Sequence, residues 1–171
     1  RNQFWSDEFL LYSDNIKKAP NRDIPHNNLG IALANIGRLD EAIEHFKSAA
    51  LIKPEYSAVH YNLGTAYGKL GRMDEAIAEF KIALRLNQDY TDAYYNLGVA
   101  YGKQGRTEEA ITQLDAALRL RPDSAEAHTK IGLAYMEQGS LNAAMEEFNA
   151  ALRQKPDVAD ADYYLGLLYS R

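Results

Sequence analysis

The chain contains no cysteine, which excludes disulfide bonds, thiolate metal sites and a cysteine nucleophile. This absence does not choose a compartment, so a cytoplasmic and an extracytoplasmic location both stay open. No apolar run approaches the roughly 18 residues of a membrane-spanning helix, so we expect no membrane insertion. Neither a signal peptide nor an initiator methionine is present, and Arg1 therefore indicates a fragment of a longer protein or a processed chain.

An excess of basic residues is also missing. The chain has 19 Lys and Arg against 24 Asp and Glu, a net charge of −5. Proteins that bind nucleic acid or anionic lipid usually carry a basic stripe, so we expect neither as a partner. No zinc-binding His–Glu–His pattern, nucleophile elbow or pair of catalytic carboxylates is found either. We therefore expect no enzymatic activity, no catalytic residues, no cofactor and no metal.

What the chain has in abundance is repetition, with a period of 34 residues. A small apolar pair recurs five times: Leu29-Gly30, Leu63-Gly64, Leu97-Gly98, Ile131-Gly132 and Leu165-Gly166. Other positions keep the same register, among them Tyr67, Tyr101, Tyr135 and Tyr169; Ala42, Ala76, Ala110 and Ala144; and Phe46, Phe80, Leu114 and Phe148. Proline stands near the end of three repeats (Pro54, Pro122 and Pro156), and Gln88 replaces it in the second. A strict period of this length indicates an array of one small unit.

Each repeat predicts a pair of helices. In the third repeat, Tyr94, Leu97 and Tyr101 fall on one face of a first helix. Ala110 and Leu114 do the same for a second helix. A glycine stands between the two helices of each repeat, where it can adopt the left-handed conformation that closes a helix: Gly37, Gly71, Gly105 and Gly139.

These positions resemble the tetratricopeptide repeat (TPR) family, whose pattern places Leu-Gly, Tyr, Ala, Phe and Pro at the same offsets. The resemblance covers nearly the whole chain. It implies an all-α solenoid, a right-handed superhelix of helix-turn-helix pairs, and a role in protein–protein interaction. The register places TPR 1 at 23–56, TPR 2 at 57–90, TPR 3 at 91–124 and TPR 4 at 125–158. Residues 1–22 are then a capping helix from a partial repeat, and 159–171 supply only the first helix of a fifth.

In such an array the first helices line the inner, concave surface. The groove-facing positions are Asn27, Asn28, Ile31 and Asn35; Tyr61, Asn62, Thr65 and Lys69; Asp92, Tyr95, Asn96, Val99 and Lys103; Glu126, Thr129, Lys130, Leu133 and Glu137; and Asp160, Tyr163, Tyr164 and Leu167. From these we take as candidate peptide-binding residues Asn28, Asn62, Asn96, Tyr61, Tyr95, Thr65, Lys69, Lys103 and Lys130.

Asn28, Asn62 and Asn96 stand one repeat apart. An asparagine amide donates and accepts hydrogen bonds, so such a ladder can bind a peptide backbone. The arrangement is similar to the asparagine ladder in the protein O-linked N-acetylglucosamine transferase family. The alternative is that asparagine is simply common at this TPR position, and Lys130 interrupts the ladder in the fourth repeat. Tyr61 and its equivalents also have two interpretations, as aromatic contact surface or as packing between helices.

Two further site hypotheses are disfavoured. The clamp of chaperone-tail-binding TPR domains requires basic residues where this chain has Asn27 and Asp92. The equivalent histidines, His26, His60 and His128, are too dispersed to bind one metal, and we expect them to fill a helix interface.

Three functions follow from these observations. The first is a scaffold that binds a peptide or partner protein in the concave groove. The second is the soluble C-terminal TPR region of a larger membrane-anchored, glycosyltransferase-like protein, a similarity suggested by the opening Trp5-Ser6-Asp7-Glu8. The third is a self-assembling module that forms homo-oligomers through the open C-terminal end, with Tyr164, Leu165, Leu168 and Tyr169 as the contact face.

Overall fold

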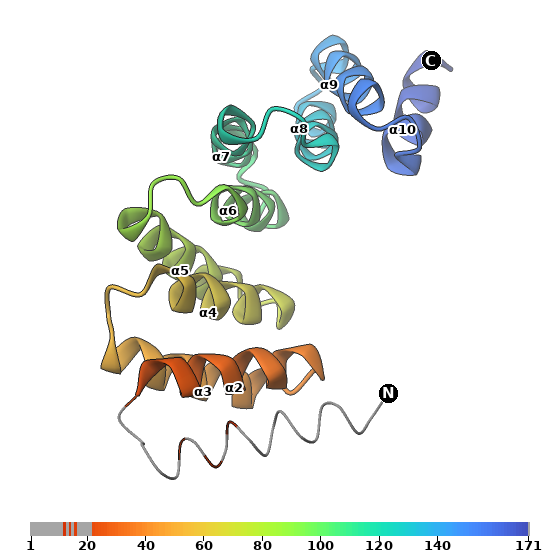
Figure 1. Cartoon of the computed structure of the whole chain (residues 1–171). Coiled ribbons are helices and arrows are strands. Elements are labelled where there is room, and N and C mark those ends of the chain that lie inside the picture. The colour runs from red at the N-terminus through yellow and green to blue at the C-terminus, as the bar shows by residue number, and fades with distance from the viewer. Residues whose placement is uncertain (1–11, 13, 15, 17–21, 171) are drawn as a thin grey trace. The chain divides into compact units, whose positions relative to one another are not determined.

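The computed structural model describes Tyr12, Asp14, Ile16 and residues 22–170, and every regular element within them is an α-helix (Figure 1). The first helices of the pairs are α2 (Asp23–Asn35), α4 (Ser57–Lys69), α6 (Thr91–Lys103), α8 (Ala125–Glu137) and α10 (Ala159–Tyr169). The second helices are α3 (Leu39–Ile52), α5 (Met73–Leu86), α7 (Thr107–Leu120) and α9 (Leu141–Gln154). The capping helix expected over residues 3–18 lies outside the described residues, except for Tyr12, Asp14 and Ile16, which are helical.

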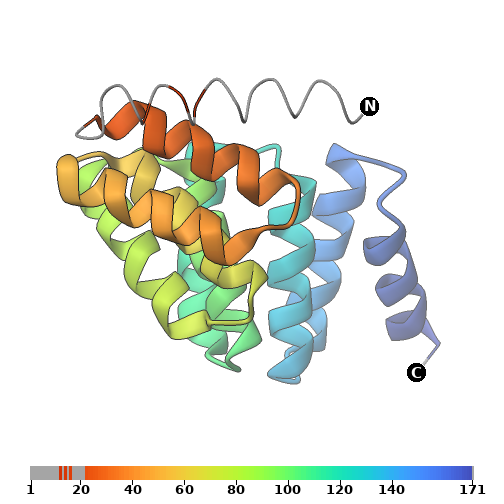
Figure 2. The same cartoon turned by 90° about the horizontal axis from the view of Figure 1, so that it is seen from below.

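The chain divides into two compact units, Arg1–Gln88 and Asp89–Arg171, a division that the periodicity did not predict. In the first unit, α2 packs on α3, α3 on α4, and α4 on α5 (Figure 2). In the second unit, each helix from α6 to α10 likewise packs on the next one along the chain. Each unit is therefore a stack of helix pairs, and the fold is an all-α solenoid. No helix among the described residues is both long enough and apolar enough to cross a membrane.

A left-handed glycine closes the first helix of each of the four complete pairs. In the second repeat, Gly71 has a φ of 77°, and the backbone N–H of Arg72 donates to the carbonyl oxygen of Tyr67 over 3.0 Å. The Arg72 guanidinium then lies 4.6 Å from the centre of the Tyr67 ring and pairs with Glu75 at 2.6 Å. The turn thus places the arginine where it contacts both helices of the pair.

In the four complete repeats, the paired helices approach closely at the glycine of the Leu-Gly or Ile-Gly pair. A Cβ atom built on Gly64 would lie 2.7 Å from the Phe80 ring and 3.1 Å from the carbonyl oxygen of Ala76. The buried Ala76 has no side chain beyond Cβ, which allows this approach. Gly166 occupies the same position of the repeat, but no described atom lies within 4 Å of its Cβ direction.

The histidines lie at helix interfaces and have partners that periodicity did not reveal. Nδ1 of His60 lies 2.7 Å from Oε2 of Glu79, joining α4 to α5, and Nε2 of His60 lies 3.0 Å from the carbonyl oxygen of Pro54. His128 makes the same 2.7 Å contact with Glu147. In the first repeat the equivalent pair is His26 and His45, whose Nδ1 atoms are 3.0 Å apart.

The structure differs from expectation at α10. Leu165 and Leu168 are buried against α9, and Tyr164 stacks on Phe148 with ring centroids 5.8 Å apart. Only Tyr169 of the four residues proposed for self-association is well exposed, at 67%. The helical face that carries Leu165 and Leu168 is used to pack on the preceding pair, because α9 and α10 are neighbours in the stack.

Candidate functional site

Each unit contains a cavity between two of its successive first helices, and the two cavities occupy equivalent places. The unit 1 slot, between α2 and α4, has a volume of about 100 Å³ and is lined by Ile31, Ala34, Asn35, Phe46, Asn62, Thr65, Ala66 and Lys69. The unit 2 slot, between α6 and α8, has a volume of about 280 Å³ and is lined by Gly98, Val99, Gly102, Lys103, Ala110, Leu114, Lys130, Leu133, Ala134 and Glu137.

The two slots are the same site of the repeat. Every residue that lines the unit 1 slot has its counterpart, two repeats later, in the lining of the unit 2 slot. Ile31 corresponds to Val99 and Thr65 to Leu133, for example. The helix-pair backbone therefore forms this hollow in both units, and the side chains decide its size and chemistry.

Two polar residues that line the unit 1 slot, Asn62 and Thr65, form hydrogen bonds within the protein. Nδ2 of Asn62 donates to Oδ1 of Asn27 over 2.9 Å, linking α4 to α2. Asn27 is only 5% exposed, so this bond satisfies a buried acceptor. Thr65 donates from its hydroxyl to the carbonyl oxygen of Tyr61, also over 2.9 Å. Lys69 is the only charged residue of the lining.

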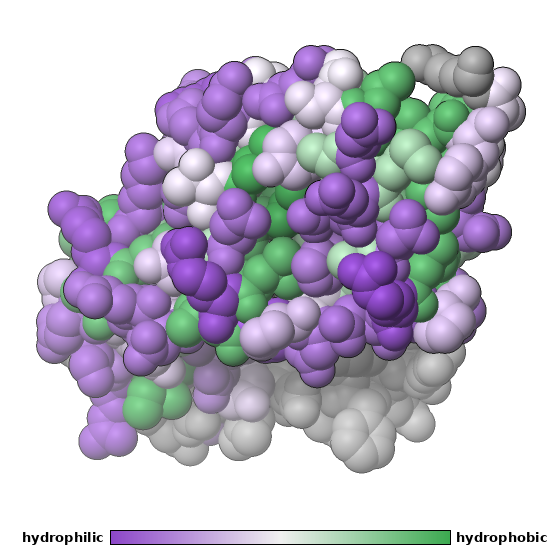
Figure 3. Space-filling model, turned by 90° about the horizontal axis from the view of Figure 1, so that it is seen from above, coloured by the Kyte–Doolittle hydropathy of each residue, from purple (hydrophilic) through white to green (hydrophobic). Residues whose placement is uncertain are grey.

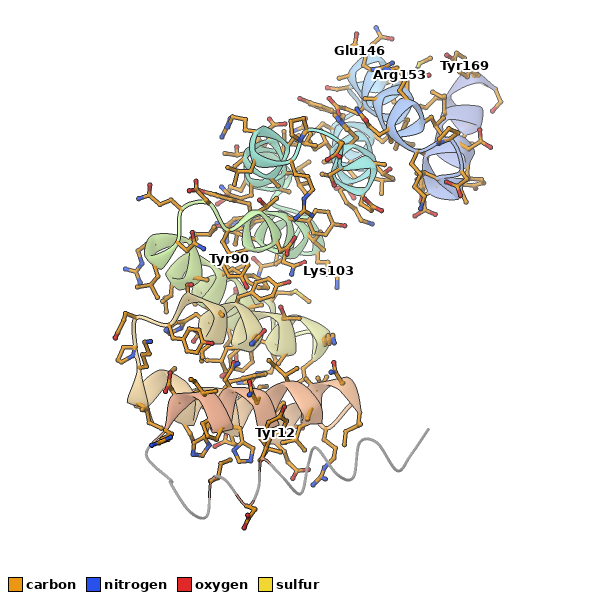
Figure 4. All side chains as sticks on the ribbon, viewed as in Figure 1. Tyr12, Tyr90, Lys103, Glu146, Arg153 and Tyr169 are labelled. Carbon is orange, nitrogen blue, oxygen red and sulfur yellow. The ribbon has the colours of Figure 1, made fainter. Side chains whose placement is uncertain are left out.

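The unit 2 slot is larger and more apolar. Val99, Leu114 and Leu133 supply branched apolar side chains, while Gly98 and Gly102 leave space on α6. Its charged groups are Lys103, Lys130 and Glu137. Lys103 lies at the C-terminal end of α6, where Figure 4 labels it, and its side chain is exposed.

A second cavity of unit 2 lies near the starts of α6 and α8. It has a volume of about 210 Å³ and is lined by Thr91, Asp92, Tyr95, Ala117, Arg121, Ser124 and Glu126. Arg121 pairs with Asp92 at 3.3 Å, although both side chains are more than half exposed. Burial raises the pKa of the Tyr95 phenol, and the carboxylate of Glu126 raises it further. Tyr95 therefore stays a neutral hydrogen-bonding group in this cavity.

The candidate peptide-binding residues are distributed over the slots and the surfaces beside them. Asn62, Thr65 and Lys69 line the unit 1 slot, and Lys103 and Lys130 line the unit 2 slot. Asn28 and Asn96 are half-buried and line none of these cavities. The tyrosines pack as well as face outward: Tyr61 lies 6.0 Å from the Phe80 ring, and Tyr95 packs on the cluster of Leu114, Ala127 and Ile131.

The sequence register identified the polar and branched first-helix residues of the slots, but it missed the small first-helix residues and the residues that the second helices contribute. Ala34, Phe46 and Ala66 complete the unit 1 slot, and Gly98, Gly102, Ala110, Leu114 and Ala134 complete the unit 2 slot. The repeat pattern explains such residues by helix packing alone. The sequence nevertheless contained a signal for the slots, because a glycine on a first helix, such as Gly102, has no side chain and leaves space beside that helix.

Acidic and histidine side chains are dispersed over the described part of the chain. No group of three or more His, Cys, Asp or Glu side chains there is placed to hold a metal ion. On the face shown in Figure 3, polar side chains divide the apolar surface into small patches.

Comparison with known proteins places the chain in a family. A family model described as "Tetratricopeptide repeat" matches residues 61–125, 100–159 and 129–170, and a model described as "TPR repeat" matches residues 32–71. No curated protein matches the chain by sequence.

Solved structures show the same fold. A crystal structure of MamA is 30% identical, with 88% of each chain covered and a TM-score of 0.84. YrrB, described as a TPR protein with an unusual peptide-binding site, is 26% identical over 93% of this chain and 82% of that chain, with a TM-score of 0.81. MamA from Desulfovibrio magneticus RS-1 is 21% identical, covers 91% of this chain and 88% of its own, and has a TM-score of 0.85. The chain belongs to the tetratricopeptide repeat family.

Proposed function

We propose that the chain is a non-enzymatic interaction scaffold whose first helices bind an extended peptide or a segment of a partner protein. The observation that carries this proposal is the pair of equivalent slots, one in each unit, at the same positions of the repeat. A hollow lined by two successive first helices suits a segment of an extended chain, which can place a side chain in it. The peptide-binding site described for YrrB adds support.

The groups around the slots suit this role. Asn62 uses one N–H of its amide on Asn27, which leaves a second N–H and a carbonyl oxygen for a ligand backbone. Half-buried tyrosines such as Tyr61 and Tyr95 supply contact area at low entropic cost. The ligand backbone and its side chains would thus be held by different residues of one face.

The proposal is tested by selecting peptides from a random library on the immobilised chain and mapping them by NMR. Selected peptides should shift backbone amides of α2, α4, α6 and α8 more than those of α3, α5, α7 and α9. The double variant Lys69→Glu, Lys103→Glu should weaken the selected peptides about tenfold, since each lysine lines a slot. The matched variant Arg85→Glu, Arg119→Glu reverses two exposed charges on second helices and should bind as wild type. Shifts confined to second helices would overturn the proposal.

A second candidate is self-association through the exposed side of α10. Tyr163 and Tyr169 are 66% and 67% exposed, and Leu167, one helical turn after Tyr163, is 36% exposed. Exposed aromatic residues of this kind are typical of interfaces. Sedimentation equilibrium distinguishes this candidate: wild type should associate with rising concentration, and Tyr163→Ser, Tyr169→Ser should remain monomeric. A wild-type monomer at high concentration would eliminate it.

A further inference from the structure

We propose that the unit 2 slot selects an apolar side chain that is flanked by acidic residues in an extended peptide. This inference rests on the proposed function and names the ligand chemistry of one of its two slots. It concerns side-chain carboxylates within a chain and does not require a terminal carboxylate.

The apolar part of the selection follows from the size and lining of the unit 2 slot. A cavity of about 150 Å³ lined by aliphatic and aromatic side chains is enough to bind benzene. The unit 2 slot, at about 280 Å³, exceeds that volume and offers Val99, Leu114 and Leu133 as walls. A leucine or phenylalanine side chain fits such a space, and its burial supplies the hydrophobic part of the affinity.

The preference for acidic residues beside the apolar side chain follows from the charge of the slot lining. Lys103 and Lys130 together outweigh Glu137, so the lining of the unit 2 slot has a net charge of +1. The unit 1 slot also has a net charge of +1, from Lys69. The linings of both slots are therefore positively charged, whereas the whole chain has a net charge of −5. Carboxylates beside the anchoring side chain would meet the two lysines at the rim of the slot, where basic peptides would be repelled.

The comparison with the unit 1 slot explains why the selection belongs to unit 2. Thr65 stands where Leu133 lines the unit 2 slot, and Asn62 stands where Lys130 does. The unit 1 slot has a volume of only about 100 Å³, and Asn62 in its lining is already hydrogen-bonded to the buried Asn27. A large apolar side chain therefore finds less space there, beside the polar side chains of Asn62 and Thr65.

Three synthetic peptides test the inference on the whole chain. All are acetylated and amidated, share a Gly-Ser frame, and carry a central leucine between two glutamates, the same leucine between two lysines, or alanine between two glutamates. In NMR titrations, the acidic leucine peptide should shift the amides of Gly98, Gly102 and Leu133. We expect the basic peptide and the alanine peptide to bind about tenfold more weakly.

A variant drawn from the chain itself tests the slot. Lys130→Asn with Leu133→Thr installs the residues that unit 1 carries at these positions, so the fold should tolerate both, as circular dichroism can verify. This variant should lose the preference for the acidic leucine peptide, whereas Lys155→Asn, an exposed charge removal outside the slot, should keep it. The inference is overturned if the basic peptide binds as tightly as the acidic leucine peptide or more tightly. It is also overturned if the double variant keeps the preference of wild type. In either case the proposed binding of peptides by the first helices is not contradicted. If neither these nor library-selected peptides shift any first-helix amide, the proposed function fails as well.

Discussion

Nδ1 of His60 and Oε2 of Glu79 lie 2.7 Å apart and connect the two helices of the second repeat. The same contact joins His128 to Glu147 in the fourth repeat. In both cases the two residues are separated by 19 positions in the chain, so the pair belongs to the geometry of the repeat.

Removing the carboxylate of this pair should destabilise the fold. Glu79→Ala leaves Nδ1 of His60 without its partner, in a side chain that is only 10% exposed. We expect a loss of about 1–3 kcal/mol in the free energy of unfolding, as for other buried groups left unsatisfied. Glu147→Ala should behave alike, while the neighbouring exposed Glu146→Ala should change the value by less than about 0.5 kcal/mol. Urea denaturation measures the free energy of unfolding of all three variants. Equal losses in the three would show that the His–Glu pairs do not stabilise the fold.

Glycine to alanine substitutions should have opposite effects at equivalent positions. Gly64→Ala places a Cβ against the Phe80 ring and a backbone carbonyl, so it should cost about 1–3 kcal/mol of unfolding free energy through overpacking. At Gly166 nothing described lies within 4 Å, and alanine should stabilise by up to about 1 kcal/mol through its higher helix propensity.

Gly68→Ala is the control for this comparison within the same helix as Gly64. Its Cβ would meet only the Cβ of Ala76, at an ordinary 3.9 Å. We therefore expect no loss of stability. Thermal unfolding followed by circular dichroism distinguishes the three variants, and a destabilising Gly166→Ala would contradict the packing argument.

Gln88→Pro should stabilise the chain. The residue before a proline must be extended, and Asn87 has φ and ψ of −142° and 102°. The residues that precede the natural prolines are similar: Lys53 at −137° and 84°, Arg121 at −137° and 86°, and Lys155 at −143° and 104°. Proline reduces the entropy of the unfolded chain, so we expect a gain of about 0.4–1 kcal/mol in unfolding free energy. Gln88→Ala should show no gain, and a loss with proline would mean that the second turn differs from the others.

The stability of the chain should fall as the pH is lowered through the range of histidine titration. Burial lowers the pKa of His45 below its ordinary value of 6.5, and His26 lowers it further, while Glu41 and Glu44 act in the opposite direction. The unfolded chain then binds a proton at this residue more readily than the folded chain. The contribution of His45 is therefore complete above about pH 6.5 and is lost as the pH falls toward the folded pKa.

His45→Gln tests this pH dependence because Gln113 occupies the equivalent position in the third repeat and does not titrate. Between pH 7.5 and 5, the thermal midpoint of wild type should fall more steeply than that of the variant. Identical slopes would assign the pH dependence to other groups.

The architecture could be predicted from the sequence because its main signal is periodic. Leu-Gly pairs and the aligned alanines report which faces of the helices meet, and the left-handed glycines report where first helices end. The same register named the first-helix residues of both slots, such as Thr65 and Leu133. These features depend on backbone faces, which periodicity describes directly.

The remaining features depend on side-chain conformations and on neighbours that are distant in the chain. The bond from Asn62 to Asn27 joins residues 35 positions apart and has no equivalent pattern in the third and fourth repeats, where Tyr95 and Lys130 replace the two asparagines. The burial of Leu165 and Leu168 follows from packing of α10 on α9. The hydrogen bond could not be read from a pattern of residue types, whereas Leu165 belongs to the fifth Leu-Gly pair and occupies a position that is buried in the other repeats.

The recurrence of one slot at the same repeat positions has an evolutionary consequence. Because the backbone forms the hollow in both units, the proposed function implies that a mutation at the position of Thr65 or Leu133 changes ligand preference without altering the architecture. Duplication or exchange of a 34-residue segment would then move the proposed binding chemistry to a new place along the chain. Under this proposal, ligand specificity diversifies by rearranging existing repeats, while the helical framework is inherited unchanged.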